Sequence, residues 1–335
     1  MNEDSLGANR LVTIFGGSGF VGRHVVQALA RRGWRIRVAV RRPDLAGHLQ
    51  PLGKVGQIHA VQANLRYPDT LIPPLRDAAA AINLVGILDE RGAQHFDAVQ
   101  HLGAQNVARA VREAGIETFV HVSAIGADAA SPSLYARTKA FGEASVRQSL
   151  PQSFIMRPSV IFGPEDQFFN RFAAMARFMP ALPLIGGGKT KLQPVFAGDV
   201  ASAIALALDG KASPGTTYEL GGPEIATLRR IYEFVLKVTA RRRLLVPLSF
   251  ESAKIVAGST EIAVKLSLGL FPELLRITRD QVDLLHHDNV VSNQALAERR
   301  TLEGLGISPE PFETFVPAYL YRYRKTGQFG GTQAS

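Results

Sequence analysis

Apolar and polar positions along the first half of the chain follow two distinct periods. Short apolar runs rich in β-branched residues are typical of strands buried on both faces of a parallel sheet. Between them lie longer stretches in which apolar residues recur every three or four positions, the period of an amphipathic helix. Strands and helices in regular alternation predict an α/β fold with a doubly wound parallel sheet. The predicted strands are Leu11–Phe15, Arg35–Val40, Gln57–Ala63, Ala80–Val85 and Thr118–Val122.

Three helices are predicted between and after these strands. The first covers Phe20–Arg32, with Gly33 as its C-cap, and the others cover Phe96–Glu113 and Ser133–Gln148. The carboxyl ends of parallel strands share one edge of a doubly wound sheet. Ligands of such sheets bind in the crevice at that edge, so the candidate site is sought there.

The first strand runs into a glycine-rich segment that leads directly into the first helix. Gly16, Gly19 and Gly22 form a G-x-x-G-x-x-G array. In this setting the first glycine permits a tight turn, the second a close approach of backbone to phosphate, and the third close helix–strand packing. The unpaired N–H groups and the dipole at the helix N-terminus favour an anion, here the pyrophosphate of a dinucleotide. The predicted cofactor residues on this loop are Gly16, Ser18, Gly19, Phe20, Val21 and Gly22.

The end of the second strand predicts which dinucleotide binds. A site for NAD places Asp or Glu roughly 20 residues beyond the glycines, on the ribose 2′-hydroxyl. Here Arg41 and Arg42 follow the strand, 41 − 16 = 25 positions after the first glycine, and Pro43 closes the element. Arginine suits a 2′-phosphate through charge-assisted hydrogen bonds. NADPH (or NADP+) is therefore the predicted cofactor and NAD(H) is disfavoured, the alternative being two solvated arginines at a strand end.

The ends of the next three strands add further candidates. Asn64 follows the third strand and could bind the adenine, although asparagine at a strand end is also ordinary turn chemistry. Gly86 follows the fourth strand, where a glycine lets the backbone pass close to a cofactor. The predicted cofactor residues at these strand ends are Asn64, Leu65, Val85, Gly86 and Val122.

Tyr135 and Lys139 lie four positions apart in the predicted helix Ser133–Gln148. Residues i and i+4 share a helix face, so both side chains can reach one pocket. An ammonium group nearby lowers the pKa of a tyrosine and makes the phenol a usable general acid or base. This spacing is also common on solvated helices, so the two residues are candidates that need further support.

Composition narrows the classes of protein. Apolar residues make up 46% of the 335 positions, which indicates a globular chain. The chain has no cysteine, which excludes disulfides and cysteine-based sites, and its histidines show no metal-ligand spacing. The polar stretch Met1–Arg10 lacks the apolar core of a signal peptide, and no apolar run reaches the roughly 18 residues of a membrane span. We therefore expect no metal and a location on the cytoplasmic side.

The net charge of +9 points to an anionic partner or to a solvated basic surface. An anionic cofactor, an acidic protein and an anionic membrane surface would all suit it. The basic residues are dispersed and no nucleic-acid-binding motif accompanies them, so no nucleic-acid partner is predicted.

The second half of the chain is less regular. A short strand is predicted at Gln193–Phe196, a helix over Val200–Leu208 with Asp199 as its N-cap, and another helix over Thr227–Thr239. Ser249–Leu270 mixes apolar residues with lysines and would form an amphipathic helix. Such a segment could meet a partner or anionic lipid headgroups, or it could pack as an ordinary helix on its own domain.

Four segments together resemble the short-chain dehydrogenase/reductase superfamily in its extended and atypical branches. They are the glycine array, the strand-end arginines, Tyr135-x-x-x-Lys139 and Arg157–Gly163 (RPSVIFG). The resemblance implies a Rossmann-like NADP(H)-binding domain over residues 9–160 and a smaller mixed C-terminal domain over 161–328, interwoven with the Rossmann sheet, with a flexible tail at 329–335. It also implies that Tyr135 and Lys139 hold the catalytic positions, that Val160 lies near the nicotinamide, and that Pro158 is a cofactor residue.

One position departs from that family. A Ser or Thr that binds the substrate oxygen usually follows the fifth strand, and the position falls here on Ala124, which has no hydrogen-bond donor. Ser123 could replace it only if the alignment shifted by one residue, which would turn the side chain to the other face. Loss of such a donor lowers a rate on the order of a hundredfold or more without preventing cofactor binding. The catalytic set is therefore incomplete, and Tyr135 and Lys139 would then be vestigial.

A narrower resemblance rests on segments from the second half of the chain. They are Arg157–Phe172 (RPSVIFGPEDQFFNRF), Thr278–Asn293 (TRDQVDLLHHDNVVSN) and Tyr319–Gln328 (YLYRYRKTGQ). These resemble the short-chain-dehydrogenase-like accessory subunit of respiratory complex I, the NADH:ubiquinone oxidoreductase. The resemblance implies a non-catalytic, NADPH-binding subunit with an assembly role and with other subunits of that complex as partners. It also implies a peripheral position on the cytoplasmic face of the inner membrane, with Ser249–Leu270 as the segment that could meet lipid.

Two other functions stay open at this point. The chain could be an NADP(H)-dependent reductase, epimerase or dehydratase, with Tyr135 as acid or base, Lys139 lowering the pKa of that tyrosine, and Ser123 or a water replacing the missing donor. Its substrate pocket would be lined from Phe162–Phe172 and the glycine loop near Gly187. A cofactor-sensing regulator is the third alternative. The intact tyrosine–lysine pair keeps the enzyme open, whereas the missing hydroxyl favours the accessory subunit.

Overall fold

The computed structural model describes residues 10–266 and 278–325, with the backbone alone for 260–266. This part of the chain forms two compact units, each assembled from three separate stretches. The first unit takes the described parts of Met1–Pro158, Ala197–Leu220 and Val291–Pro309, and the second takes those of Ser159–Phe196, Gly221–Val290 and Glu310–Ser335. Residues 197–220 and 291–309 thus belong with the N-terminal stretch and not with the residues that flank them.

The first unit contains a seven-stranded sheet in the order β11-β6-β5-β4-β1-β2-β3. Every neighbouring pair in it is parallel, so the predicted doubly wound α/β fold is confirmed. The strand order changes direction between β1 and β4, which is the point where doubly wound sheets bind ligands. The strands are β1 (Leu11–Phe15), β2 (Arg35–Val40), β3 (Ile58–Gln62), β4 (Ala80–Asn83), β5 (Thr118–Val122), β6 (Phe154–Pro158) and β11 (Thr217–Leu220).

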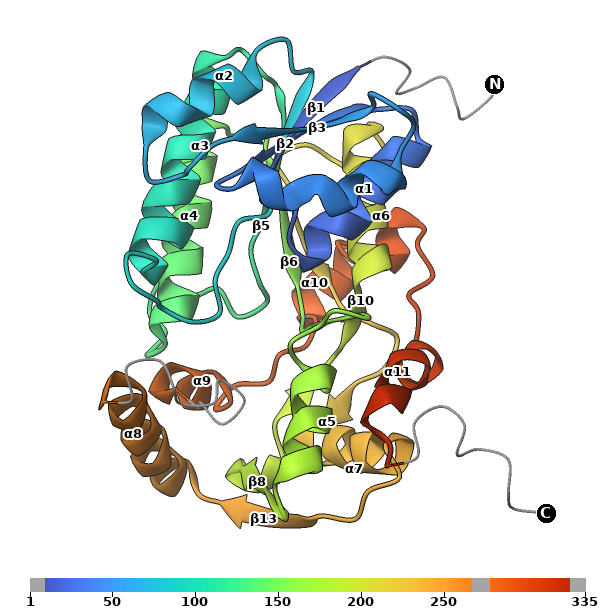
Figure 1. Cartoon of the computed structure of the whole chain (residues 1–335). Helices are drawn as coiled ribbons and strands as arrows, with labels where there is room; N and C mark the ends of the chain where they lie inside the picture. Colours follow the sequence, from blue (N-terminus) through green and yellow to red (C-terminus); the bar gives the residue numbers. More distant parts are fainter. Residues whose placement is uncertain (1–9, 267–277, 326–335) are drawn as a thin grey trace, which may run out of the picture. The chain divides into compact units, whose positions relative to one another are not determined.

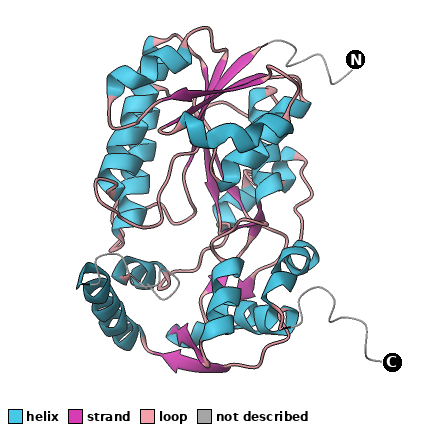
Figure 2. Ribbon diagram, in the orientation of Figure 1, coloured by secondary structure: helices cyan, strands magenta, loops and turns pink. Residues whose placement is uncertain are grey.

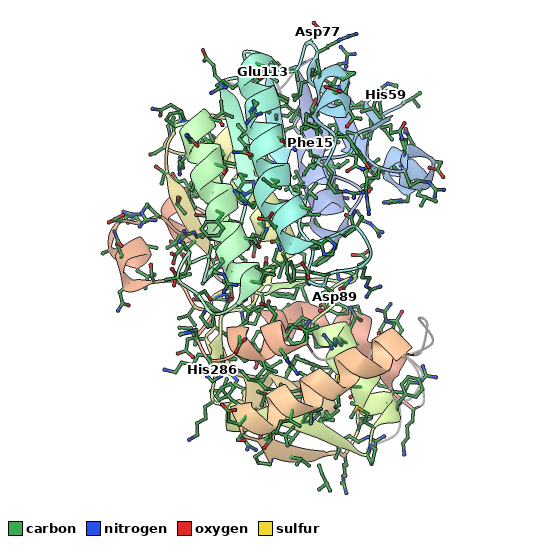
Figure 3. The ribbon with its side chains drawn as sticks, turned by 90° about the vertical axis from the view of Figure 1, so that its left-hand side faces the viewer. Phe15, His59, Asp77, Asp89, Glu113 and His286 are labelled. Atoms are coloured by element: carbon green, nitrogen blue, oxygen red, sulfur yellow. The ribbon has the colours of Figure 1, made fainter. Side chains whose placement is uncertain are left out.

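Helices cover both faces of this sheet (Figure 1). Helices α1 (Phe20–Arg31) and α6 (Ala197–Leu208) pack together on one face, and α3 (Leu102–Glu113) and α4 (Leu134–Ser149) on the other. Apolar side chains of the strands and helices fill the space under α3 and α4, with Phe15 at its centre (Figure 3). Burial of such a continuous apolar layer is the main force that holds the helices on the sheet. The short helices α2 (Ile72–Leu75) and α10 (Asn293–Ala297) also belong to this unit.

Helix α3 differs from the continuous helix predicted over Phe96–Glu113. Asp97–His101 forms a π-helical turn that precedes it. Helix α4 packs against this turn so closely that a Cβ on Gly142 would lie 2.2 Å from the carbonyl oxygen of Gln100. Wider turns of this kind occur often beside functional sites, and no residue pattern along the helix marks this one.

Two further boundaries differ from the sequence prediction. Helix α6 begins at Ala197, so Asp199 lies inside its first turn and is not its N-cap. Of the strand predicted at Gln193–Phe196, only Val195–Phe196 is a strand, β10, and β9 (Lys191–Leu192) ends just before the predicted stretch. The first difference shifts a helix start by a few residues and the second concerns strands of two residues, and local pattern resolves neither.

The second unit is built on an aromatic core with short two-stranded sheets (Figure 2). Phe162, Phe169 and Phe312 are fully buried in it, and the rings of Phe169 and Phe312 stack 5.6 Å apart. The strands are paired as β10 with β7 (Ile161–Phe162), β9 with β12 (Ala226–Thr227), and β8 (Ala181–Ile185) with β13 (Leu244–Leu248). The helices are α5 (Phe169–Phe178), α7 (Leu228–Val238), α8 (Phe250–Leu266), α9 (Arg279–Leu284) and α11 (Phe312–Leu320).

Helix α8 covers most of the segment predicted to be amphipathic. Ala253 and Ala257 are buried against their own unit, whereas Ile255 is 74% exposed. Residues 267–270 of that segment, and the predicted tail 329–335, lie outside the described residues. Within the part of the chain that is described, none of the helices has the length and apolar character needed to cross a bilayer.

Candidate functional site

The loop between β1 and α1 has the close contacts that its glycines predict. Gly16 has φ +81°, and a Cβ there would lie 2.9 Å from Cγ2 of Val85. A Cβ on Gly22 would lie 2.4 Å from the carbonyl oxygen of Gly17, so only glycine allows α1 to start this close to the loop. A Cβ on Gly19 would meet only the Gly16 carbonyl oxygen at 3.4 Å. The first and third glycines are therefore required by the fold, whereas Gly19 leaves its surroundings open for a ligand.

The N-terminus of α1 has no anion of its own among the described residues. Gly19 is its N-cap and supplies no side-chain hydrogen bond, and the first turn contains no acidic residue. Four N–H groups at a helix start lack partners within the helix, and the dipole adds positive potential there. Ser18, Phe20 and Val21 flank this point and are half-buried. The arrangement can hold a phosphate, as predicted from the glycine spacing.

The two arginines after β2 differ in their surroundings. Arg42 binds Asp44 through two nitrogens, with Nη2–Oδ2 at 2.6 Å and Nε–Oδ1 at 3.0 Å. This hydrogen-bonded pair raises the pKa of Arg42 and lowers that of Asp44. Arg41 is exposed, and no acidic group among the described residues pairs with it. Arg41 is thus the better placed of the two for an added phosphate, and Asp44 is an acid at this strand end that the sequence reasoning passed over.

Asn64 and Leu65 are occupied by local structure. The Asn64 side chain accepts a hydrogen bond from the backbone N–H of Arg66 at 3.2 Å, which is the turn chemistry weighed as the alternative to adenine binding. Leu65 is 7% exposed and belongs to the core beneath α3. Its backbone oxygen accepts a hydrogen bond from Asn106 Nδ2 at 2.9 Å. Any contact of these two residues with a cofactor would therefore come from the Asn64 amide or from backbone atoms.

The segment after β4 is held by a buried amide. Oδ1 of Asn83 accepts the backbone N–H of Val85 at 3.1 Å, and Nδ2 of Asn83 donates to Nδ1 of His121 at 3.3 Å. Burial, and next the nearby Lys139, lower the pKa of His121 to about 3, so the imidazole is neutral. Asn83 and His121 were not singled out from the sequence. The only available signal was a polar residue within each of two otherwise apolar strands, β4 and β5.

Tyr135 and Lys139 meet on the inner face of α4, as their spacing predicts. The Lys139 Nζ lies 6.0 Å from the centre of the Tyr135 ring and donates to the Val122 carbonyl oxygen at 3.3 Å. Lys139 is 5% exposed, and burial lowers its pKa to about 8 against the opposing effect of Glu143. A Cβ on Gly86 would lie 3.2 Å from the Lys139 Nζ, so the strand end of β4 and this ammonium are neighbours. The Tyr135 ring packs edge-on against Phe96, with ring centres 5.8 Å apart.

Glu143 lies one helical turn beyond Lys139 and pairs with an arginine from β6. Arg157 Nη2 and Nε lie 2.7 and 2.9 Å from the two carboxylate oxygens of Glu143. The Glu143 side chain is 9% exposed and that of Arg157 26%. The pair fixes α4 against β6, and it brings a negative charge near the buried ammonium. The i, i+4 spacing of Lys139 and Glu143 was a signal that could have found it.

The hydroxyl expected after β5 is absent from the surface of the site. Ala124 is half-buried and has no donor. Ser123 is 4% exposed, and its Oγ has no hydrogen-bond partner among the described residues. Pro158 is buried at the end of β6, and its carbonyl accepts from the Ile125 N–H at 2.9 Å. Val160 belongs to the second unit, whereas all the other predicted cofactor residues belong to the first.

The described residues therefore bring one group of predicted site residues together. Gly16 lies beside Val85 and Gly86 beside Lys139, at distances that a Cβ on either glycine would fill. Lys139 donates to the Val122 carbonyl and lies 6.0 Å from the centre of the Tyr135 ring. All lie at the carboxyl ends of β1, β4 and β5 or on the helix beside them. A dinucleotide at this edge would supply or accept a hydride, and the phenol of Tyr135 could give or take a proton there. The described residues contain no group of three potential metal ligands.

The second unit has a buried acid that serves its own packing. Asp166 is 3% exposed and accepts hydrogen bonds from Tyr319 Oη at 2.5 Å and from the N–H groups of Phe168 and Asn170 at 3.0 Å. Burial raises the pKa of Asp166 despite these bonds. Phe162, taken from the sequence as part of a substrate-pocket lining, is fully buried in the aromatic core. Asp166 and Phe162 therefore stabilise the packing of the second unit.

Comparison with known proteins identifies the family of this site. The model of the NAD dependent epimerase/dehydratase family matches residues 12–221, more than half of the chain. The chain belongs to the NAD dependent epimerase/dehydratase family. The match contains the glycine loop, the strand-end arginines and the tyrosine–lysine pair in one stretch. A nicotinamide dinucleotide is the cofactor class of this family, and the phosphate-binding loop described above fits it.

Individual relatives differ in how much of the chain they cover. The mitochondrial NADH dehydrogenase (ubiquinone) 1 alpha subcomplex subunit 9 of Arabidopsis thaliana is 35% identical over 96% of this chain and 80% of its own length. A ceramide reductase of Caulobacter vibrioides is 36% identical over 53% of this chain and 55% of its own length. Among solved structures, an NADPH-dependent quinone oxidoreductase of Escherichia coli in complex with NADPH superposes with a TM-score of 0.69. It covers 92% of this chain and 99% of its own at 21% identity, which shows the shared fold.

Proposed function

We propose that this chain is an accessory subunit of a membrane-associated respiratory NADH:quinone oxidoreductase, and that its first unit holds NADPH without turning it over. The observation that carries the proposal is the 35% identity to the Arabidopsis thaliana subunit over 96% of the chain. A likeness of that extent includes the second unit as well as the cofactor-binding sheet. It therefore favours a shared role in assembly over a shared cofactor alone.

The choice of NADPH rests on the end of β2. Arg41 is exposed there and no acidic group among the described residues pairs with it. An added 2′-phosphate would gain a charge-assisted hydrogen bond from this guanidinium. Asp44 could instead serve a ribose hydroxyl, but Arg42 binds it through two nitrogens. Dinucleotide selectivity would thus depend on how these three residues share their hydrogen bonds.

The lack of turnover is inferred from the hydroxyl that the site does not present. In an active reductase of this fold, a donor beside Tyr135 would polarise the substrate carbonyl. Ala124 offers none, and Ser123 is 4% exposed. Lys139 is equally buried, at 5% exposed, and donates to a backbone carbonyl. These side chains would hold a nicotinamide in place and would leave a substrate oxygen without a donor.

A peripheral membrane position is supported by one edge of the second unit, which we call the β13 edge. It consists of Arg177 and Phe178 at the end of α5, and Arg241, Arg243 and Leu244 at the start of β13. Phe178 is 70% exposed and Leu244 73%. Burial, followed by the nearby charges of Arg243 and Arg177, lowers the pKa of Arg241, so both of these arginines are electrostatic neighbours of Arg241. Exposed apolar side chains beside clustered cations suit an anionic lipid surface, here that of the cytoplasmic face of the inner membrane.

Purification of the tagged chain from gently solubilised membranes tests the central proposal. Native mass spectrometry would identify co-purifying subunits, and extraction followed by chromatography would identify the nucleotide. We expect retained NADPH together with redox subunits of the complex. A chain that is recovered alone and that exchanges NADP(H) freely would contradict the proposal.

Binding to vesicles with and without anionic lipid tests the β13 edge. The variant is Leu244→Ser. The matched control is Ile225→Ser, which changes an exposed apolar residue elsewhere in the second unit.

A second candidate function is an NADP(H)-dependent reductase, favoured by the contact between Tyr135 and Lys139. The ammonium lies 6.0 Å from the phenol ring, which suits a tyrosine acting as general acid. The Caulobacter vibrioides relative makes ceramide the first substrate class to test with NADPH. Oxidation of NADPH that depends on added substrate and is lost in Tyr135→Phe would establish this function in place of the first. Unchanged NADPH in wild type and in Ala124→Ser would exclude it for the substrates tested.

A further inference from the structure

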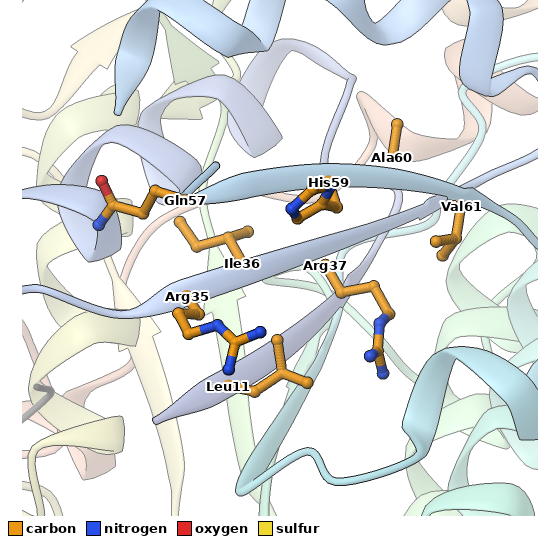
Figure 4. Close-up of a pocket in the computed structure, with 8 residues that line it drawn as sticks. All are labelled: Leu11, Arg35, Ile36, Arg37, Gln57, His59, Ala60 and Val61. Atoms are coloured by element: carbon orange, nitrogen blue, oxygen red, sulfur yellow. The ribbon is translucent and has the colours of Figure 1, made fainter. Parts of the chain in front are cut away.

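Two adjoining hollows lie at the amino ends of β1, β2 and β3, at the opposite edge of the sheet from the cofactor loop. Their volumes are about 270 and 740 Å³, and both are lined by Arg35 and Gln57. Figure 4 shows the smaller one, which is lined by residues from the start of β1, from β2 and from β3. The larger one continues past the end of α1 to the loop before β3. We call these two adjoining hollows, which share Arg35 and Gln57, the channel.

The side chains that line this channel carry only positive charge. Five of them are basic, and no Asp or Glu lines either hollow. No acidic group among the described residues pairs with any of the five by an ion pair or hydrogen bond. We call this set the basic groove: Arg31, Arg35, Arg37, Lys54 and His59.

Hydrogen bonds to backbone carbonyls fix parts of the groove, although the positive side chains that line it do not attract one another. Arg37 Nη1 donates to the carbonyl oxygens of Pro74 at 2.7 Å and Arg76 at 2.8 Å, which fixes that guanidinium. Gln57 Nε2 donates to the carbonyl oxygens of Ala30 and Trp34 at 2.8 and 2.9 Å, which fixes the wall shared by both hollows. Arg37 and His59 lie directly opposite each other on β2 and β3, an arrangement that disfavours the sheet when both are charged. A solely structural role does not account for this set of side chains.

We propose that the basic groove binds an extended, acidic segment of a partner protein. Arg35 and Arg37 lie two positions apart on β2 and therefore on the same face, roughly 6.6 Å apart along the strand. Carboxylates at alternate positions of an extended segment have the same spacing, and each can bind a guanidinium through two hydrogen bonds. Leu11 lies beside Arg35 on the neighbouring strand, and Val61 follows His59 two positions along β3. Both line the smaller hollow and offer apolar contact for the stems of such side chains.

A compact phosphate group fits this channel less well than spaced carboxylates. The end of α1 that borders it, at Ala30 and Arg31, is the carboxyl end of that helix. The helix dipole is negative there and opposes a concentrated negative charge. Phosphate sites in proteins more often use the opposite end of a helix, as the cofactor loop of this unit does. Charge spread along the channel can avoid that end and still reach the other four basic side chains, Arg35, Arg37, Lys54 and His59.

Site-specific photo-crosslinking tests the proposal in the intact chain within its own cells. Val55 lines the larger hollow and is fully exposed, so a photoreactive residue there reports on the groove without removing a charge. We expect crosslinks to a protein segment with two or more carboxylates at alternate positions. Arg35→Glu combined with Lys54→Glu should lower the crosslink yield about tenfold, the effect of about 1.4 kcal/mol of binding free energy. The side chains of Arg35 and Lys54 make no hydrogen bond or ion pair among the described residues. Their backbone N–H groups donate to the Arg10 carbonyl and to Oε1 of Gln57, and both substitutions keep these bonds, so the fold should be unaffected.

The matched control is Arg109→Glu combined with Arg112→Glu, two exposed arginines on α3 with the same change in charge. This control should keep the wild-type yield. An unchanged yield in the groove variant would overturn the proposal, as would the absence of any crosslink or crosslinks only to lipid, to a segment without carboxylates, or to residues 1–9 of the chain itself. The groove lies at the opposite sheet edge from the nucleotide, so nucleotide content should be equal in all these chains. Failure of this test is therefore distinct from failure of the proposed cofactor role.

Discussion

Arg42 and Asp44 bind each other at the strand end where a dinucleotide would place its ribose, with Nη2 and Oδ2 2.6 Å apart. Both side chains are well exposed, at 67% and 57%, so the pair can open at small cost. Two outcomes are available at this position: Asp44 can face a ribose hydroxyl, or the arginines can face a 2′-phosphate. Selectivity for the dinucleotide would then be set by a competition between hydrogen bonds.

Substitutions at this strand end should separate the two dinucleotides. Arg41→Gln should weaken NADPH binding on the order of tenfold, the usual effect of losing a hydrogen bond to a charged group, and should leave NADH binding nearly unchanged. Asp44→Asn should release Arg42 and increase the preference for NADPH. Calorimetric titration of both nucleotides against wild type and the two variants measures this. Equal losses for NADPH and NADH in Arg41→Gln would show that this arginine does not contact the 2′-phosphate.

The glycines of the cofactor loop should divide into two classes. Gly22→Ala brings a Cβ to 2.4 Å from a backbone oxygen, so we expect a loss of about 2–3 kcal/mol in the free energy of unfolding. Gly19→Ala makes only a 3.4 Å contact and should keep the stability of the fold, yet lower nucleotide affinity by obstructing the phosphate. Urea unfolding and nucleotide titration, done on both variants, distinguish the two effects. Full nucleotide affinity in Gly19→Ala would contradict the close approach of backbone to phosphate.

Acid should destabilise the first unit through His121. The pKa of this imidazole is lowered to about 3 in the folded chain, first by burial and then by Lys139. Between pH 6.5 and 3 the unfolded chain binds more protons than the folded one, so the free energy of unfolding falls as the pH falls. We expect His121 to account for about 2 kcal/mol of loss between pH 7 and 4.5. Urea unfolding of wild type and His121→Asn at both pH values measures it, because the variant should lack this part of the loss.

Lys139 should affect the free energy of unfolding at alkaline pH, as His121 does at acidic pH. Burial lowers its pKa to about 8, below the value of an unfolded lysine. From pH 8 to about 10.4 the unfolded chain binds more protons, so stability should rise with pH in that window. We expect an increment of about 1–2 kcal/mol in wild type that is missing in Lys139→Met. Identical pH profiles for the two chains between pH 8 and 10 would show that the ammonium is better solvated than its burial indicates.

The ion pair of Glu143 and Arg157 should stabilise the packing of α4 on β6. Glu143→Gln leaves a largely buried guanidinium with only the more distant Glu219, 4.0 Å away, as an acidic neighbour, and we expect a loss of about 3 kcal/mol. Replacing both residues by methionine should recover most of that loss, because no charge remains to be desolvated. Chemical denaturation of Glu143→Met, Arg157→Met and the double methionine variant gives the coupling energy between the two residues. A double variant as unstable as Glu143→Gln would indicate that packing volume, and not charge, is decisive here.

The sequence was sufficient for the fold of the first unit because its strands carry their own pattern. β1, β2 and β5 have the predicted bounds, and the parallel order follows from the regular helical connections. The π-helical turn at Asp97–His101 could not be predicted, since the carbonyl of Gln100 and the backbone of Gly142 meet only in three dimensions. Local pattern specifies elements, whereas a wider turn is imposed by the neighbour that packs on it.

Side-chain partners were the least predictable part of the candidate site. Tyr135 and Lys139 could be paired from helical spacing, and the structure places them together. The ion pair between Asp44 and Arg42 could have been predicted from their separation of two residues. The hydrogen bond between Asn83 and His121 joins two residues that lie 38 positions apart in the sequence, and no periodicity indicates it. Hydrogen bonds between distant positions need the register of the sheet, which a single sequence does not contain.

The chain alternates between its two units in six stretches, and this affects how the protein is made. Arg300 Nη1 donates to the carbonyl oxygen of Thr217 at 2.5 Å, and Glu219 accepts from the backbone N–H of Ser292 at 2.7 Å. These contacts complete the β11 edge of the cofactor-binding sheet with residues translated long after its central strands. A ribosome must therefore synthesise most of the chain before the N-terminal sheet is finished. Folding of this sheet is therefore completed only when translation is nearly over.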